Sequence, residues 1–289
     1  MSDNDIVVEA WNTVLFDKFT RFKHLLVAGL AGHSDEVLSR GLYPAGASVL
    51  DVGCGFGDST VRIASAVGPT GRAVGIDCAE NFIRAAATDA KSAGVQNASF
   101  LTVDVQTDDL RGPYDCGFAR FGTMFFMNPG AALRNIARAL KPGGVFTQIV
   151  WRKRDENPWL HDAELRVREI VPVVAHEDTS EVHCGAGPFS MAGPDMVSSM
   201  MKAAGFEGIT FERFDTDICI GRDLDEAIEF AMALGPAGEI IRLAGGEGER
   251  LRPQVVVALR DTLSKYVRED GVWAPSSSWF ITGRTRRNR

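Results

Sequence analysis

Apolar side chains recur at helical spacing near the start of the chain. Within residues 5–30 they follow one another in steps of three or four residues, at Trp11, Leu15, Phe19, Phe22 and Leu26. Such spacing places them on one face of a helix. The pattern predicts one long amphipathic helix ahead of the rest of the fold. We expect its aromatic stripe to serve mainly in packing.

Short apolar runs then alternate with helical segments over the next hundred residues. The runs predict a buried strand at 47–52 and further strands at 73–77, 99–104, 114–119 and 144–151. The segments between them predict helices at 59–67, 79–93 and 131–140. Five strands separated by helices are typical of a doubly wound α/β fold with a parallel sheet.

The second half of the chain loses this alternation. Helical patterns cover 157–171, 194–204, 224–234 and 252–267, with a glycine-rich break at 245–248 before the last of them. Asp223 and Glu226 stand three residues apart, which is a capping-box variant at the start of the third helix. Residues 208–220 and 278–285 read as extended, and 174–188 show no strong period.

The charge balance narrows the class of protein. The 289 residues include 31 Lys+Arg and 38 Asp+Glu, a net charge of −7. This disfavours a dedicated nucleic-acid binder, since the only basic cluster is a C-terminal arginine run that we interpret as a solvated tail. The start is acidic and lacks a secretory pattern, no window could span a membrane, and the five cysteines form no Cys-x-x-Cys pair. We therefore expect a cytoplasmic protein with reduced thiols.

The most informative segment joins the first strand to its helix. The sequence Asp-Val-Gly-Cys-Gly-Phe-Gly occupies 51–57, and glycines there let the backbone approach a ligand at a helix N-terminus. A dinucleotide fingerprint would require a third glycine where Asp58 stands, and a carboxylate there would repel a diphosphate. Asp77 and Asp104 end the next two strands, so both belong to the carboxyl edge where open α/β sheets bind ligands.

These features together resemble the class I S-adenosylmethionine-dependent methyltransferases. The resemblance rests on residues 51–57, on Asp77 and Asp104, and on Leu-Lys-Pro-Gly-Gly at 140–144. It is nearest to the small-molecule group that includes the quinone-biosynthesis C-methyltransferases. The later stretch 187–206 is also similar to that group.

The resemblance implies a fold and a division of the chain. The fold would be a Rossmann-like, seven-stranded mixed sheet whose last strands, 207–220 and 278–285, are antiparallel, with a helical N-terminal extension and inserted cap helices. The expected parts are an N-terminal lid (1–42), a cofactor-binding core (43–151), an inserted cap (152–206), and C-terminal strands and helices that complete the sheet (207–289).

The resemblance also implies roles for individual residues. The loop at 53–57 would lie against the methionine portion of S-adenosylmethionine, Asp77 would hold the ribose hydroxyls, and Asp104 would accept from the adenine amino group. Arg120 would pair either with the cofactor carboxylate or with an anion of the substrate. The full cofactor-binding set is Asp51, Gly53, Cys54, Gly55, Asp77, Cys78, Phe82, Asp104, Val105 and Arg120.

The implied reaction is methyl transfer to a small organic acceptor by in-line displacement, leaving S-adenosylhomocysteine. The sulfonium leaving group is already activated, so no catalytic base is assigned. The alternatives are an NAD(P)-dependent Rossmann oxidoreductase and a non-catalytic cofactor-binding module. An aromatic acceptor pocket would draw on Phe121, Phe125, Phe126 and Trp151.

The sequence also bears on metal binding and on the oligomeric state. His176, His183 and Cys184 match no metal-ligand spacing, so we expect no metal site. The oligomeric state stays open, with a homodimer as one option.

Overall fold

One mixed sheet forms the centre of the molecule. The computed structural model describes residues 3–172 and 187–287. Within these residues the strand order is β3-β2-β1-β4-β5-β8-β6, with β7 paired to β8 beside this path. The strands are β1 (Ser48–Val52), β2 (Arg72–Asp77), β3 (Ala98–Thr102), β4 (Tyr114–Arg120), β5 (Leu140–Trp151), β6 (Phe206–Gly221), β7 (Val267–Arg268) and β8 (Gly271–Thr285).

The predicted fold class is confirmed, with one more strand than expected. The first five strands pair in parallel, whereas β8 runs antiparallel to both β5 and β6. The additional strand is β7, whose two residues pair with the start of β8. So short a hairpin arm carries no apolar run that a sequence pattern could reveal.

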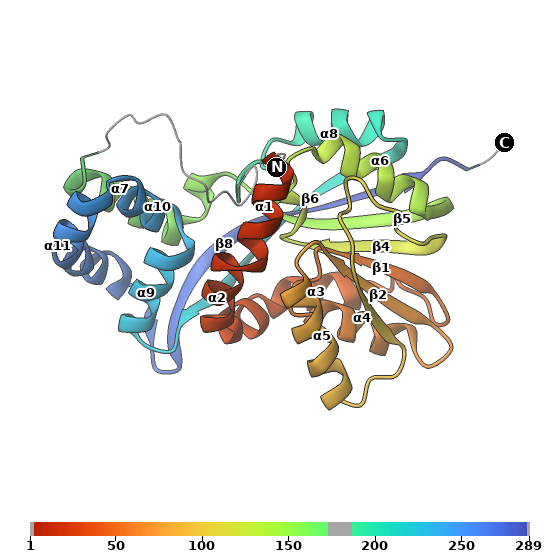
Figure 1. Ribbon diagram of the computed structural model, residues 1–289, viewed down its shortest axis with the longest axis horizontal. Helices are drawn as coiled ribbons and strands as arrows, with labels where there is room; N and C mark the ends of the chain where they lie inside the picture. The colour runs from red at the N-terminus through yellow and green to blue at the C-terminus, as the bar shows by residue number, and fades with distance from the viewer. Residues whose placement is uncertain (1–2, 173–186, 288–289) are drawn as a thin grey trace.

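Helices cover both faces of this sheet, as a doubly wound fold requires (Figure 1). They include α4 (Asp58–Val67), α5 (Glu80–Ser92), α6 (Pro129–Ala139) and α8 (Pro194–Ala203). Neighbouring residues of β1 bury into different cores: Val49 packs with Ile63 of α4, and Leu50 belongs to the core that contains Leu133 of α6. Both faces are thus apolar, which explains the continuous hydrophobic runs of the parallel strands.

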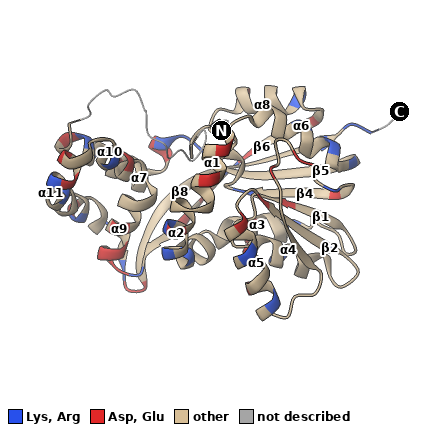
Figure 2. Cartoon of the chain, in the orientation of Figure 1, with Lys and Arg blue, Asp and Glu red and all other residues tan. Residues whose placement is uncertain are grey.

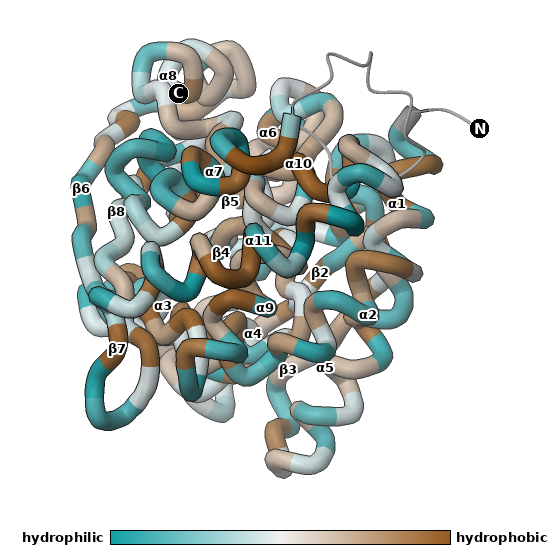
Figure 3. The backbone as a smooth tube through the Cα atoms, turned by 90° about the vertical axis from the view of Figure 1, so that its left-hand side faces the viewer, coloured by the Kyte–Doolittle hydropathy of each residue, from teal (hydrophilic) through white to brown (hydrophobic). Residues whose placement is uncertain are grey.

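A helical lobe stands apart from the sheet and is carried by the two longest strands (Figure 1). It contains α7 (Pro158–Ile170), α9 (Leu224–Leu234), α10 (Pro236–Leu243) and α11 (Gly245–Ser264). Only residues 278–284 of β8 pair with β5, so the first half of β8 pairs with β6 and β7 and continues toward the lobe. In Figure 3 the tubes of α9, α10 and α11 alternate between hydrophilic and hydrophobic stretches, as amphipathic helices do.

The lobe draws on different segments from those we expected. Helix α8 packs against α6 and β6 beside the sheet, although the predicted cap at 152–206 includes it. Of the helices that were grouped with the sheet-completing segment, α10 packs against α7, and α9 packs against α10, α11 and β6.

The glycine-rich break predicted at 245–248 is helical. Helix α11 begins at Gly245, and a Cβ on Gly248 would come within 2.2 Å of the carbonyl oxygen of Ile241. Glycine is therefore required there by the close approach of α10, and it does not end the helix.

The predicted single N-terminal helix is wrong. The chain forms α1 (Asp3–Asn12), α2 (Val14–Arg21), the π-helical turn η1 (Leu25–Gly29) and α3 (Ala31–Ser39). Helix α1 ends where the carbonyl oxygen of Asn12 accepts a hydrogen bond of 2.6 Å from the side chain of Asn81. A contact with a residue so distant in the sequence leaves no local signal.

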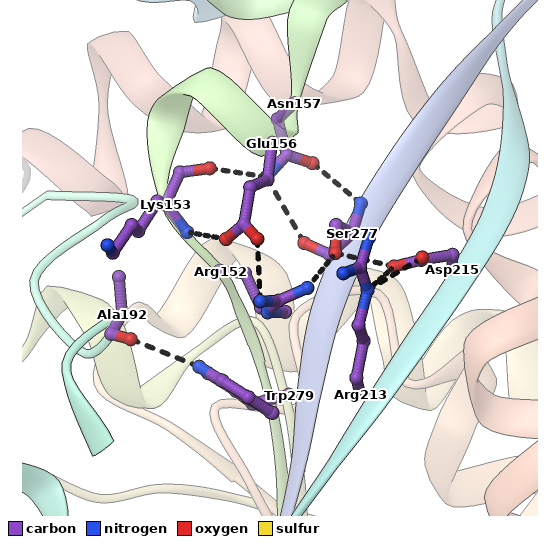
Figure 4. A network of polar contacts seen from close by, with 9 residues as sticks. All are labelled: Arg152, Lys153, Glu156, Asn157, Ala192, Arg213, Asp215, Ser277 and Trp279. Atoms are coloured by element: carbon purple, nitrogen blue, oxygen red, sulfur yellow. Dashed lines mark hydrogen bonds and ion pairs between the residues drawn. The ribbon is translucent and has the colours of Figure 1, made fainter. Parts of the chain in front are cut away.

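A polar network fastens the lobe to the sheet (Figure 4). The guanidinium of Arg152 donates to Ser277 Oγ at 3.1 Å and pairs with Glu156 at 2.6 Å. Ser277 donates its N–H to Asn157 Oδ1 and its hydroxyl to Asp215. The network spans the end of β5, the turn η3 (Arg154–Glu156), β6 and β8, so it fixes the direction in which the chain enters the lobe.

Charges of both signs are interspersed over the described helices (Figure 2). Among the described residues, no helix is long and apolar enough to cross a membrane.

Candidate functional site

The strand order reverses between β1 and β4, and the loops that follow these two strands meet there. Gly53 follows β1 with φ +67°, and a Cβ on it would lie 3.2 Å from the Cα of Gly122 after β4. Open α/β sheets bind their ligands at such a switch point.

A cavity of about 780 Å³ opens at this point, between the sheet edge, the N-terminal helices and the lobe. Its volume lies in the upper part of the range of small-molecule sites. Nine of the ten predicted cofactor-binding residues line it: Gly53, Cys54, Gly55, Asp77, Cys78, Phe82, Asp104, Val105 and Arg120. The four aromatic residues predicted for an acceptor pocket, Phe121, Phe125, Phe126 and Trp151, line it as well.

Asp51 is the predicted residue that lies behind the cavity wall. Its side chain is fully buried, and Oδ2 accepts hydrogen bonds from Ser59 Oγ at 2.7 Å and Thr60 Oγ1 at 2.6 Å. Burial raises the pKa of Asp51 to about 6, against the opposing effect of the two hydroxyls. The carboxylate therefore joins the end of β1 to the first turn of α4.

Asp77 ties the glycine loop to the end of β2. Its Oδ2 accepts from the N–H of Gly55 at 3.1 Å, and Oδ1 accepts from the N–H of Ala79 at 3.0 Å. Burial raises the pKa of Asp77, and these backbone donors oppose that shift. Each carboxylate oxygen has a second lone pair, so Asp77 can still accept two hydrogen bonds from a ligand in the cavity.

Asp104 is bonded to the N-terminal helix. Its Oδ2 accepts from Asn4 Nδ2 at 2.5 Å, and its Oδ1 accepts from the N–H of Gln106 at 2.8 Å. Gln106 also donates to Asn4 Oδ1 at 2.6 Å. The start of α1 is thereby held across the end of β3.

Aromatic rings hold the rest of α1 and α2 over the loop. The ring centroid of Trp11 lies 5.2 Å from that of Phe125 and 6.3 Å from that of Phe82, and the ring centroids of Phe16 and Phe82 are 5.0 Å apart. Trp11 and Phe19 also line the cavity, whereas Phe22 packs on Phe230 at 5.3 Å. The aromatic stripe thus serves in packing and, at Trp11 and Phe19, in the cavity wall.

Arg120 and Asp58 form an ion pair in the wall. Two guanidinium nitrogens lie 2.8 Å from the two carboxylate oxygens, and Arg120 also donates to Ser34 Oγ at 2.9 Å. Their side chains are only 9% and 14% exposed. The carboxylate of Asp58, which we expected to repel a diphosphate, is thus paired with the guanidinium of Arg120. Opposite charges that follow two adjacent strands are the sequence signal that could have revealed this pair.

Comparison with known proteins decides the family. Residues 44–205, more than half of the chain, match the family described as "Methyltransferase domain". The chain belongs to this methyltransferase family.

Two relatives of this protein are methyltransferases whose names contain that of a small molecule. It is 33% identical to nocamycin O-methyltransferase of Saccharothrix syringae over 56% of this chain and 59% of that protein. It is 35% identical to demethylmenaquinone methyltransferase of Staphylococcus aureus over 58% of this chain and 71% of that protein. The first match thus spans less than two thirds of its relative's length.

The fold of this methyltransferase is also similar to that of a solved structure. The YcgJ protein of Bacillus subtilis superposes with a TM-score of 0.56 at 19% identity, covering 89% of this chain and all of that one. The fold is that of a class I S-adenosylmethionine-dependent methyltransferase.

Sequence reasoning missed one buried ring beside the site. His33 of α3 is fully buried, and its ring lies 5.1 Å from Phe121 and 5.6 Å from Trp151. Neither ring nitrogen has a hydrogen-bond partner among the described residues. Burial, with Arg120 nearby, lowers the pKa of His33 to about 4, so the ring is neutral at neutral pH.

The described part of the methyltransferase contains no cluster of residues that could hold a metal ion. His176, His183 and Cys184, which we did not expect to bind metal, lie outside the described residues.

Proposed function

We propose that this protein transfers the methyl group of S-adenosylmethionine to a small organic molecule by in-line displacement. The observation that carries the proposal is the cavity at the β1/β4 switch point, which has the glycine loop, Asp77 and Asp104 in its wall. Membership of the methyltransferase family supports it independently.

The wall fits the cofactor. Asp77 keeps the accepting capacity that a ribose diol needs, and the loop from Gly53 to Gly55 presents backbone without side chains to the methionine portion. Asp104 would accept from the adenine amino group, and Val105, Cys78 and Phe82 would pack around the adenosine. Asp51 would act indirectly, by fixing the loop and α4.

The chain's own contribution would be alignment and exclusion of water. When bound, the cofactor supplies a methyl group on a sulfonium, which is already a good leaving group. The aromatic wall formed by Trp11, Phe121, Phe125 and Trp151 is suited to holding the acceptor in line in a dry site. Methyl transfer to an acidic or soft nucleophile then needs no dedicated base.

An NAD(P)-dependent oxidoreductase is not favoured. The family match is to methyltransferases, and Asp58 occupies the place of the third glycine of the dinucleotide fingerprint. A non-catalytic module with the same fold remains the competing proposal, and a transfer assay separates the two.

The assay supplies purified protein with methyl-labelled S-adenosylmethionine and a metabolite extract, followed by mass analysis of labelled products. We expect at least one labelled small molecule that is absent when the protein is omitted. Binding of S-adenosylhomocysteine without labelling of any product across extracts from varied sources would support the non-catalytic module instead.

We also propose a cytoplasmic location. The supporting observations are the four described cysteines, Cys54, Cys78, Cys116 and Cys219, all of which are free thiols. Fractionation of cells that express the tagged protein tests this directly.

A further inference from the structure

The cavity has two halves of opposite charge. The half at the sheet edge contains Asp58, Asp77 and Asp104 against one cation, Arg120. Since Asp58 and Arg120 neutralise each other, the net charge of this half is −2. That sign suits S-adenosylmethionine, whose sulfonium and ammonium outweigh its single carboxylate.

The half that faces the lobe has the opposite balance. Among the described residues, its charged lining consists of Lys18 of α2, Arg154 of η3, and Glu239 and Arg242 of α10. Arg154 shares the buried Glu164 with Arg168, at 2.6 and 2.8 Å.

Among the described residues, the pairing leaves an excess of positive charge at Lys18 and Arg154. Arg154 shares one carboxylate, Glu164, with Arg168, whereas Arg242 pairs with Glu239 at 2.5 Å. Lys18 forms no ion pair with any described residue.

The surroundings of these cations are apolar. Trp159 and Leu160 of α7, Phe230 and Leu234 of α9, and Phe189 line the same half, and the guanidinium of Arg154 lies 5.3 Å from the Phe189 ring centroid. A cation in such a wall loses part of its hydration, which a bound anion restores.

We propose that the methyl acceptor is an organic anion with an apolar, ring-containing body. Its body lies between the aromatic side chains of the lobe and those of the sheet edge, and its anionic group faces Lys18 and Arg154. This inference rests on the proposed function and specifies its substrate class.

Two dyes with the same ring system test the charge preference. The protein, saturated with S-adenosylhomocysteine, is titrated with 1-anilinonaphthalene-8-sulfonate and, separately, with the uncharged N-phenyl-1-naphthylamine. Lys18→Met should weaken binding of the sulfonate dye about fivefold and leave the uncharged dye unchanged, since it removes a partly buried charge and keeps most of the apolar stem.

Lys23→Met is the matched control. Lys23 pairs with Asp89 and does not line the cavity, so the same substitution there should change neither dye constant. The inference is overturned if Lys18→Met leaves sulfonate binding unchanged, or if it weakens both dyes equally.

Calorimetry with S-adenosylhomocysteine on the same preparation separates the two claims. If S-adenosylhomocysteine binds and Lys18→Met does not weaken the sulfonate dye selectively, the proposal of an anionic acceptor is wrong and the proposed function stands. If the product does not bind, the proposed function itself fails. In the transfer assay, the acceptor should be retained when the extract passes over an anion exchanger at pH 7, and an acceptor found only in the flow-through would contradict the inference.

Discussion

The side-chain amide nitrogen of Asn4 lies 2.5 Å from Oδ2 of Asp104, one hundred residues further along the chain. Asn4 sits in the second position of α1, and Asp104 follows β3 at the ligand-binding edge of the sheet. The helix that covers the cavity is therefore tied to the carboxylate that we assign to the adenine. A second tie, from Asn12 to Asn81, holds the other end of α1.

Removing the hydrogen bond between Asn4 and Asp104 should weaken the hold of α1 over the cavity. Asn4→Ala removes a hydrogen bond to a charged acceptor, worth about 1.5–3 kcal/mol when buried and less at this partly exposed site. We expect S-adenosylhomocysteine to dissociate about fivefold faster, as followed by intrinsic tryptophan fluorescence in stopped flow. Glu9→Ala, an exposed position on the same helix, is the control. Equal dissociation from Asn4→Ala and wild type would show that the tie does not retain the ligand.

Substitution of only one partner of the Arg120–Asp58 ion pair should destabilise the fold. Either Arg120→Met or Asp58→Leu leaves one nearly buried charge unpaired, and each should lower the free energy of unfolding by about 3 kcal/mol in urea denaturation. The double variant should lose clearly less than the sum of the two. Additive losses would mean that the two side chains do not interact in solution.

Two glycines of the loop offer a matched comparison. A Cβ on Gly57 would come within 2.6 Å of the Phe100 ring and 2.7 Å of Ala86, at φ +75°. A Cβ on Gly55, at φ +53°, would meet no atom within 4 Å. Gly55→Ala should therefore cost only about 1–2 kcal/mol for the left-handed backbone, and Gly57→Ala should lower the thermal midpoint much further. Similar midpoints would contradict the close packing of Phe100 and Ala86 around Gly57.

His33 should make the protein sensitive to acid. Its folded-state pKa of about 4 lies below the usual 6.5, so the unfolded chain takes up a proton first as the pH falls. The stabilisation is fully present above pH 6.5 and is lost progressively as the pH falls from 6.5 through 4, by about 3 kcal/mol in total. His33→Leu should reduce the difference in unfolding free energy between pH 7.5 and pH 4.5 by most of that amount.

The control for this experiment is Val257→Leu, because the Val257 side chain on α11 is exposed and does not titrate. It should leave the acid sensitivity in place. Unchanged acid sensitivity in His33→Leu would place the titrating group elsewhere.

The cofactor-binding half of this protein could be predicted because its signals are local. The parallel strands contain short apolar runs, and Asp77 and Asp104 stand at strand ends whose position follows from topology alone. The capping residue Asp223 is likewise local, and its carboxylate accepts the N–H of Glu226 at 2.8 Å.

The rest depends on contacts between distant residues. The N-terminal helix ends at a hydrogen bond from Asn81, and glycine is required at 248 because the carbonyl oxygen of Ile241 lies so close to it. Asp51 could be placed at the end of a strand, but whether its carboxylate faces the cavity or the Ser59 and Thr60 hydroxyls depends on the first turn of α4. The acceptor half of the cavity escaped prediction for the same reason, since α9 and α10 reach it only through the long β6–β8 pair.

The central claim is that the carboxylate of Asp77 holds the ribose of S-adenosylmethionine or its product. Calorimetric titration with S-adenosylhomocysteine tests this most directly, with Asp261→Ala, an exposed position on α11, as the control variant. We expect one site per chain in wild type and control, and binding to Asp77→Ala weaker by at least about thirtyfold, since two hydrogen bonds to a charged acceptor are lost. Equally tight binding by Asp77→Ala and wild type would contradict it.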